Sequence, residues 1–283
     1  MYSILIPTFN NYKYLKFTIQ SIKNTSKLDN EILVHVSDDY NNETRNFLKN
    51  ENIKFTYSEK NIGLCSAINL ISKYSNKKYI IYSHDDMYFC PDWEKTLTKE
   101  IINLGHDKFY FSGSMIEQDS GHIKFNCGEN LENFNEKKLL DNIKDLNIKD
   151  HQGSHFAPHC VHRNMWLKVN GFSEEFNPGI ASDPDFNMKL WNEGVRIFKG
   201  LNDFKVYHFG SITTRKNKYV KQNRGDITFI KKWGFSTKFF KKYYLRSNTI
   251  YFGPLDEPKK DFNYFFDLIK CKIKLLYLKI FTK

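Results

Sequence analysis

The chain has 283 residues, of which 40% are hydrophobic and 27% charged, an ordinary balance for a globular protein with a sizeable core. Its formal net charge of +11 favours an anionic partner, which could be a nucleic acid, an anionic membrane surface or a phosphorylated substrate. The five cysteines are scattered and never spaced as C-x-x-C, which argues against a disulfide framework or structural zinc and favours a reducing compartment. We find neither a signal peptide nor an apolar stretch long enough to span a bilayer, so we expect a cytoplasmic protein.

Short apolar runs alternate with helical patterns through the first part of the chain. Apolar side chains recur at helical spacing over residues 15–22 and 64–71. Strand and helix alternating in this way predict an α/β fold with a mostly parallel central sheet flanked by helices. The predicted strands are residues 3–7, 31–37, 54–57, 79–83 and 109–112.

The pattern changes after residue 112. Residues 113–160 are rich in Gly, Asn and His and indicate a long loop or insertion. Two further helices are predicted at residues 163–169 and from about 185 to 192. Beyond residue 215 the composition shifts to Lys, Tyr and Phe, so we expect a main domain over 1–215 and a basic, aromatic, helical extension over 216–283.

Two acidic pairs directly follow predicted strands. Asp38 and Asp39 close the strand 31–37, and Asp85 and Asp86 close the strand 79–83. Ligands of open parallel sheets bind at the carboxyl ends of the strands, and a divalent cation would relieve the repulsion within one of the pairs. Ordinary turn and N-cap chemistry explains either pair alone, but it explains two pairs at matching positions less well.

A third acidic spot precedes the last predicted helix of the main domain. Asp185 can serve as the N-cap of that helix, with Pro184 restricting its entry. Capping does not explain Asp183. A lone carboxylate at the ligand-binding edge of the sheet, beside a bound cation, would suit a general base. His208 ends a further apolar run, and taken alone it indicates a packed polar residue.

The order and spacing of these pieces resemble family 2 glycosyltransferases with the GT-A fold. The first segments resemble the family's nucleotide-binding strand ends, and HDDM stands where the family carries its D-x-D motif. The later segments resemble a conserved turn, the segment with the catalytic base, and a late histidine. The matching segments are 4–10 (ILIPTFN), 36–40 (VSDDY), 61–69 (NIGLCSAIN), 84–87 (HDDM), 170–176 (NGFSEEF), 182–186 (SDPDF) and 206–210 (VYHFG).

The resemblance implies inverting transfer of a sugar from a nucleoside diphosphate to a hydroxyl of a glycan or lipid-linked acceptor. Asp183 would be the general base, and Asp86 and His208 would bind the metal. Asp39 would accept a hydrogen bond from the base of the nucleotide, with Asp38 beside it, and Asp85 would face the ribose or sugar. The implied nucleotide-sugar contacts are Pro7, Thr8, Asn10, Asp38, Asp39, Asn61, Gly63 and Asp85.

Two chemical arguments narrow these expectations. A carboxylate at the base pocket accepts from the N3–H that uracil and thymine have and cytosine lacks, which favours a UDP- or dTDP-sugar, while guanine also offers an N–H donor. Either Mn²⁺ or Mg²⁺ fits a carboxylate site, and the imidazole of His208 slightly favours Mn²⁺.

Residues 262–283 predict a basic amphipathic helix. Such a helix suits the headgroup layer of an anionic membrane, which would place the protein peripherally on the inner face. Alternatively, its apolar face packs on the main domain or on a second subunit, with the lysines merely solvated. The sequence leaves both open.

Two other classes of function compete with an enzyme. A non-catalytic nucleotide-sugar or glycan-binding protein could share the fold, but the presence of Asp86, Asp183 and His208 argues against a decayed site. Lys and aromatic residues interleave over residues 231–246, as in some proteins that bind single-stranded nucleic acid. Because no recognised nucleic-acid module accompanies them, we expect no nucleic-acid partner.

Overall fold

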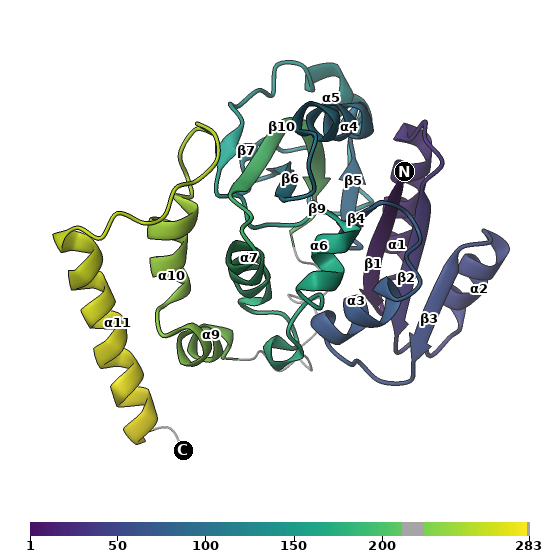
Figure 1. Ribbon diagram of the computed structural model, residues 1–283. Helices are drawn as coiled ribbons and strands as arrows, with labels where there is room; N and C mark the ends of the chain where they lie inside the picture. Colours follow the sequence, from purple (N-terminus) through teal and green to yellow (C-terminus); the bar gives the residue numbers. More distant parts are fainter. Residues whose placement is uncertain (211–223, 282–283) are drawn as a thin grey trace.

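The computed structural model describes residues 1–210 and 224–281 as an α/β protein built on one ten-stranded sheet that helices flank (Figure 1). The strand order along the main path is β3-β2-β1-β4-β9-β6-β10-β5, with β7 beside β6 and β8 beside β10. This arrangement confirms the predicted fold class. All five cysteines are free and buried.

The amino-terminal part of the sheet is parallel. Strand β1 pairs in parallel with both β2 and β4, and β2 pairs in parallel with β3. The apolar runs behind these predicted strands are continuous because the two central strands are covered on both faces. The elements are β1 (Tyr2–Phe9), α1 (Tyr12–Thr25), β2 (Glu31–Ser37), α2 (Glu43–Asn50), β3 (Lys54–Ser58), α3 (Leu64–Ser72) and β4 (Tyr79–Tyr82).

Beyond β4 the sheet is mixed. Strand β9 runs antiparallel to β4 and β6, and β10 runs parallel to β6 but antiparallel to β5 and β8. Strand β5 lies at the far edge of the sheet, where its partner is β10. The elements are β5 (Met87–Phe89), α4 (Trp93–Leu104), β6 (Phe109–Glu117), β9 (His159–His162), α6 (Arg163–Lys168) and β10 (Ile197–His208).

The region 113–160 is more ordered than the predicted loop. Strand β6 continues to Glu117, and β7 (Ile123–Lys124), α5 (Glu136–Asn142) and β8 (His151–Gln152) follow. Buried side chains of this region form a second small core with the end of β10, including Leu139 and Tyr207. The prediction of a long loop was therefore wrong, because elements this short carry no readable periodicity. The alternative prediction, an insertion, stays a prediction.

Helix α7 (Ser182–Asn192) begins earlier than predicted. Its N-cap is Ala181, in the left-handed conformation with φ 66°. Asp183 and Asp185 therefore lie in the first turn, and the assignment of Asp185 as an N-cap was wrong. Pro184 does not delay the helix, because the first turn has no intrahelical acceptor for the N–H group that proline lacks.

The carboxy-terminal extension is joined to the main domain by a shared core. It comprises α9 (Gly225–Trp233), α10 (Thr237–Phe239), a π-helical turn η2 (Phe240–Leu245) and α11 (Phe262–Phe281). Buried Phe229 and Phe240 belong to the same apolar cluster as the sheet. Within the described residues, none of the helices combines the length and apolar character that crossing a membrane requires. The predicted boundary between 215 and 216 lies outside the described residues and stays a prediction.

Candidate active site

The carboxyl ends of neighbouring strands bring the first predicted residues together. Pro7 and Thr8 lie near the end of β1, and the Thr8 hydroxyl donates to the Asp85 carboxylate at 2.6 Å. The Asn10 amide donates to Asp38 at 3.1 Å. Asn10 and Asp38 have φ of 49° and 51°, a left-handed conformation that Asn and Asp adopt more readily than most residues. The loops after β1, β2 and β4 thus meet at one edge of the sheet.

Asp39 already has a structural role at this edge. Its buried carboxylate accepts from the backbone N–H groups of Thr44 at 3.3 Å and Arg45 at 3.0 Å, and from Arg45 Nε at 3.1 Å. It therefore caps the start of α2. Because a carboxylate offers about four acceptor positions, one further N–H can still bind, and the role of Asp39 toward a nucleotide base stays a prediction.

The loop before α3 is shaped by close backbone approach. Asn61 Oδ1 accepts from the Gly63 N–H at 2.8 Å, and Gly63 has φ 83°, where glycine is favoured. A side chain at Gly63 would also collide with Asn177. Asn177 Oδ1 accepts from the Cys65 N–H at 2.9 Å and so caps α3 from a distant part of the chain. Nothing in the sequence pattern indicates this contact, and the nucleotide contacts of Asn61 and Gly63 stay predictions.

Three side chains form a cluster that could hold a metal ion. His84, Asp86 and His208 each offer one ligand atom, and these atoms lie within 4.8 Å of one another. Asp86 Oδ1 is 3.3 Å from His208 Nε2. The structure thus brings together the two predicted metal ligands and adds His84, which the sequence reasoning missed although it stands two residues before Asp86.

Glu117 orients the imidazole of His208. Its carboxylate lies 2.5 Å from Nδ1, on the side of the ring away from Asp86. Burial alone would lower the pKa of His208, but the carboxylates of Asp86 and Glu117 outweigh it and raise the pKa to about 10. Burial, and then the neighbouring His208, lower the pKa of His84 to about 4, which leaves His84 neutral and able to bind a metal.

The donor set fits a divalent transition ion. One carboxylate and two imidazoles suit Mn²⁺ better than Mg²⁺, which prefers oxygen ligands. Metal-ligating histidines usually bind a carboxylate through the other ring nitrogen, and Glu117 supplies that carboxylate to His208. The residues present therefore fit the predicted cation.

Asp85 lies beside the cluster, where its carboxyl is buried next to the carboxylate of Asp86. Burial, followed by the charge of Asp86, raises the pKa of Asp85 to about 7, against the hydrogen bond from Thr8. The repulsion expected within this acidic pair is therefore present, and a cation at Asp86 would relieve it.

Asp183 lies in the first turn of α7. Its Oδ1 is buried and has no hydrogen-bond partner among the residues that the structure describes. Burial raises the pKa of Asp183 to about 7, and the charge of Lys241 opposes that rise. The pKa of Tyr82 is raised first by burial and then by charges that include Asp183, Asp85 and Asp86. Tyr82 therefore lies within electrostatic reach of the predicted base and of both members of the pair.

The extension contributes to this neighbourhood, which sequence reasoning missed. Fully buried Asp185 accepts from Ser173 Oγ at 2.6 Å and from Trp233 Nε1 at 2.8 Å, and Lys232 Nζ lies 2.9 Å away. These contacts fix α9 against the first turn of α7. A carboxylate at position 185 is therefore explained by these contacts with α9. In the sequence, the only sign of them was the adjacent pair Lys232 and Trp233.

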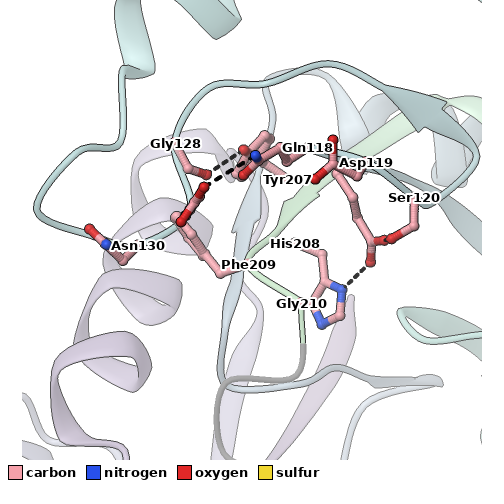
Figure 2. A pocket seen from close by; sticks show the side chains of 11 residues that line it. Gln118, Asp119, Ser120, Gly128, Asn130, Tyr207, His208, Phe209 and Gly210 are labelled. Carbon is pink, nitrogen blue, oxygen red and sulfur yellow. Dashed lines mark hydrogen bonds and ion pairs between the residues drawn. The ribbon is translucent and has the colours of Figure 1, made fainter. Parts of the chain in front are cut away.

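A cavity of about 470 Å³ opens beside His208 (Figure 2). The hydroxyl of Tyr207 is fixed at its wall, because it donates to the Gly128 carbonyl at 2.6 Å and accepts from the Cys127 N–H at 3.1 Å. Carboxylates, side-chain amides and aromatic rings share the lining. The lining residues are Glu117, Gln118, Asp119, Ser120, Gly128, Glu129, Asn130, Tyr207, His208, Phe209 and Gly210.

The sequence also matches a known protein family. Residues 3–161 match the family described as Glycosyl transferase family 2. The GalNAc(5)-diNAcBac-PP-undecaprenol beta-1,3-glucosyltransferase of Campylobacter jejuni is 25% identical over an alignment of 233 residues that covers 77% of this chain and 69% of that protein.

Two solved structures share the fold. One is S. aureus TarS 1-349 in complex with UDP-GlcNAc, with a TM-score of 0.54 and 15% identity over 74% of this chain. The other is GalNAc-T7 with UDP, GalNAc and Mn²⁺, with a TM-score of 0.57 and 12% identity over 74% of this chain. This chain spans 60% and 43% of those two chains. Because the family match covers more than half of the sequence, the chain belongs to glycosyl transferase family 2 and is a glycosyltransferase with the GT-A fold.

Proposed function

We propose that this glycosyltransferase moves a sugar from a nucleoside diphosphate to an acceptor hydroxyl with inversion, with Asp183 as the general base. The observation that carries the proposal is that Asp183, Asp85 and Asp86 all act electrostatically on Tyr82. The ring of Tyr82 lies 5.5 Å from that of His84, a member of the ligand cluster. In the proposed displacement, the acceptor oxygen bonds to the anomeric carbon while the bond from that carbon to the phosphate oxygen breaks. The acceptor proton passes to Asp183.

The environment of Asp183 supports this role. A base needs a pKa near the working pH, so that it is ionised and still takes the proton readily. Burial provides such a pKa, about 7, and the buried Oδ1 has no hydrogen-bond partner among the described residues that would compete for the proton. Perturbed carboxyl groups of this kind are typical of functional sites.

The donor is proposed to be a UDP- or dTDP-sugar. Asp38 and Asp39 lie at the end of β2, where one of them would accept from the N3–H of uracil or thymine. Asp85, anchored by Thr8, would face the ribose or sugar. The UDP-GlcNAc held by TarS and the UDP held by GalNAc-T7 support a UDP-sugar on this fold.

The metal is proposed to be Mn²⁺ or Mg²⁺, with Mn²⁺ favoured. Asp86 and His208 would hold it, with His84 as a third ligand and Glu117 orienting His208. When bound, a divalent cation stabilises the negative charge that develops on the leaving diphosphate. The Mn²⁺ in the GalNAc-T7 structure supports this choice.

The acceptor is proposed to be a glycan or a lipid-linked glycan. The printed name of the C. jejuni relative describes a glucosyltransferase acting on an undecaprenol-linked glycan. The cavity beside His208 supports a hydroxyl-rich group, because carboxylates and amides accept and donate hydrogen bonds to hydroxyls. Its acidic lining disfavours a second anionic group there.

The alternative of a nucleic-acid-binding protein loses its main support. That hypothesis relied on aromatic rings in residues 231–246 that could stack on bases. Phe235, Phe239 and Phe240 are instead buried in the core. Two of the lysines in this segment are also engaged with acids, because Lys232 pairs with Asp185 and Lys242 with Asp267.

A thermal-shift panel tests the proposal. UDP, dTDP, GDP and CMP are added to the wild type with and without Mn²⁺. A ligand at about 100 times its Kd adds about 2.7 kcal/mol to the free energy of unfolding, which raises the melting temperature by several degrees. We expect UDP or dTDP to give the largest rise, and Mn²⁺ to increase it.

Two variants sharpen the panel. Asp86→Asn should remove the effect of Mn²⁺, whereas Asp141→Asn, at an exposed surface ion pair, should behave as wild type. If no nucleotide raises the melting temperature in either condition, the proposed donor site is wrong. An Mn²⁺ effect that survives in Asp86→Asn would remove Asp86 from the metal site.

A further inference from the structure

Helix α11 packs onto the protein through one narrow stripe. Tyr264, Cys271 and Leu278 are buried, and Leu268 and Leu275 are partly buried. Successive members are three or four residues apart and therefore share one face of the helix. Figure 1 shows α11 at the outer edge of the molecule, on the far side of α9 and α10 from the sheet.

The opposite side of α11 exposes large apolar side chains. Phe262 is 81% exposed and Ile273 is 64% exposed, values far above those of an apolar face that packs on its own protein. Soluble proteins rarely expose contiguous apolar patches of this kind without a binding role. We call this set the docking face: Phe262, Phe265, Phe266, Ile269, Ile273, Leu276, Tyr277 and Ile280.

Lysines border the docking face on both sides. At about 100° per residue, Lys270 and Lys274 lie along one border, and Lys272 and Lys279 lie along the other. All four are exposed. Residues 268–280 contain no Asp or Glu. In the first row, Lys270 lies 3.3 Å from Asp267 and Lys274 lies 3.8 Å from Asp226, as exposed ion pairs that contribute little and leave both ammonium groups accessible. The helix therefore has three zones: a buried stripe, an exposed apolar face, and a row of lysines on each side of that face.

We propose that the docking face binds the headgroup layer of an anionic phospholipid membrane, with α11 lying in the plane of the surface. An apolar face enters the boundary between headgroups and acyl chains when it is flanked by cations that reach the phosphates. The buried stripe holds the rest of the protein on the other side of α11. In this orientation both rows of lysines contact the negatively charged phospholipid headgroups.

A second copy of this chain suits the docking face less well. In a two-fold contact the same surface meets itself, so lysine rows from both copies would be brought together around a shared apolar seam. Like charges at such borders oppose association. An anionic surface neutralises the same charges, which is why we choose the membrane as the occupant.

The position of α11 also connects the docking face to the candidate active site. Tyr264 packs its ring against Tyr243 of η2, with 5.2 Å between the ring centroids. Lys241 of the same turn acts electrostatically on Asp183. Membrane binding through α11 would thus also hold the η2 turn, and with it Lys241, relative to the bilayer. The inference itself stands without the proposed chemistry, since binding is measured without a substrate.

Vesicle sedimentation of the full chain tests the inference. The wild type should bind vesicles of phosphatidylcholine with phosphatidylglycerol, bind phosphatidylcholine alone weakly, and lose affinity as salt is added. The double substitution Phe266→Ser and Ile273→Ser should lower the partition coefficient at least tenfold. Replacing Lys272 or Lys279 by Gln should lower it by about fivefold each on anionic vesicles.

A matched control separates the docking face from general surface hydrophobicity. Ile102 on α4 is 69% exposed, and Ile102→Ser should bind vesicles as the wild type does. Because all substituted side chains are exposed, the melting temperatures should stay unchanged. Equal vesicle binding by the double variant and the wild type would overturn the proposal. So would a dimer that Ile273→Ser dissociates while the wild type binds no vesicles, because the face would then belong to a second copy.

Discussion

The substitution Asp183→Asn tests the proposed base most directly. Asn keeps the shape of the side chain in the first turn of α7 but cannot take a proton from the acceptor. General-base catalysis contributes about two to four powers of ten to a rate. We therefore expect kcat to fall by about 100- to 10,000-fold, while the thermal shift produced by the nucleotide stays as in the wild type.

The pH dependence follows from the raised pKa. Asp183 acts as a base only when ionised, so kcat/KM of the wild type should fall about tenfold per pH unit below about 7 and level off above it. Lys241 favours the ionised form, so Lys241→Met should move this fall to higher pH. Lys238→Met, at an exposed position one turn earlier, should leave the profile unchanged.

The free energy of unfolding should fall as pH rises, whereas kcat/KM should rise with pH. The pKa of Asp183 rises from 3.8 to about 7 on folding, so the native state holds a proton that the unfolded state releases between these values. The free energy of unfolding of the wild type therefore falls as pH rises from about 4 to about 7. At about 1.4 kcal/mol per pH unit, the Asn variant should gain up to about 4 kcal/mol relative to wild type over this window.

Two measurements check this reasoning. Release of the nucleoside diphosphate from the donor selected by the thermal-shift panel gives the rates, and urea unfolding at several pH values gives the stabilities. Asp141→Asn serves as the control for a surface carboxylate. Unchanged turnover in Asp183→Asn would remove this residue from the mechanism, and a stability difference independent of pH would show that its carboxyl is not perturbed.

Three further substitutions test the supporting structure. Glu117→Gln should weaken Mn²⁺ binding about 10- to 100-fold, because the substitution loosens the orientation of His208. The Mn²⁺ dependence of the nucleotide-induced thermal shift measures this weakening, and an unchanged dependence would contradict the prediction. Trp233→Phe leaves buried Asp185 without one donor and should cost about 1–3 kcal/mol in urea unfolding, whereas wild-type stability would show that this contact is dispensable. Gly63→Ala forces a side chain into a left-handed, crowded position and should lower the melting temperature; an unchanged midpoint would mean that the loop relaxes freely.

The sequence by itself determined the amino-terminal, parallel part of the sheet and much of the candidate site. Strands β1 and β4 are readable because central parallel strands, covered on both faces, produce continuous apolar runs. The acids that follow them, Asp38 and Asp85 among them, then fall at one edge of the sheet by topology alone. Asp86 and His208 were predicted as a pair, and their side chains are 3.3 Å apart.

Only the tertiary structure decided which side chains support these residues. Glu117 lies 91 positions from His208, and the two meet because β6 and β10 are neighbours in the sheet. Asp185 proved to be an anchor for the extension rather than an N-cap, and the apolar face of α11 proved to be exposed. A sequence pattern reports the period of one element, but a contact between two elements depends on strand order and packing, which no local period contains.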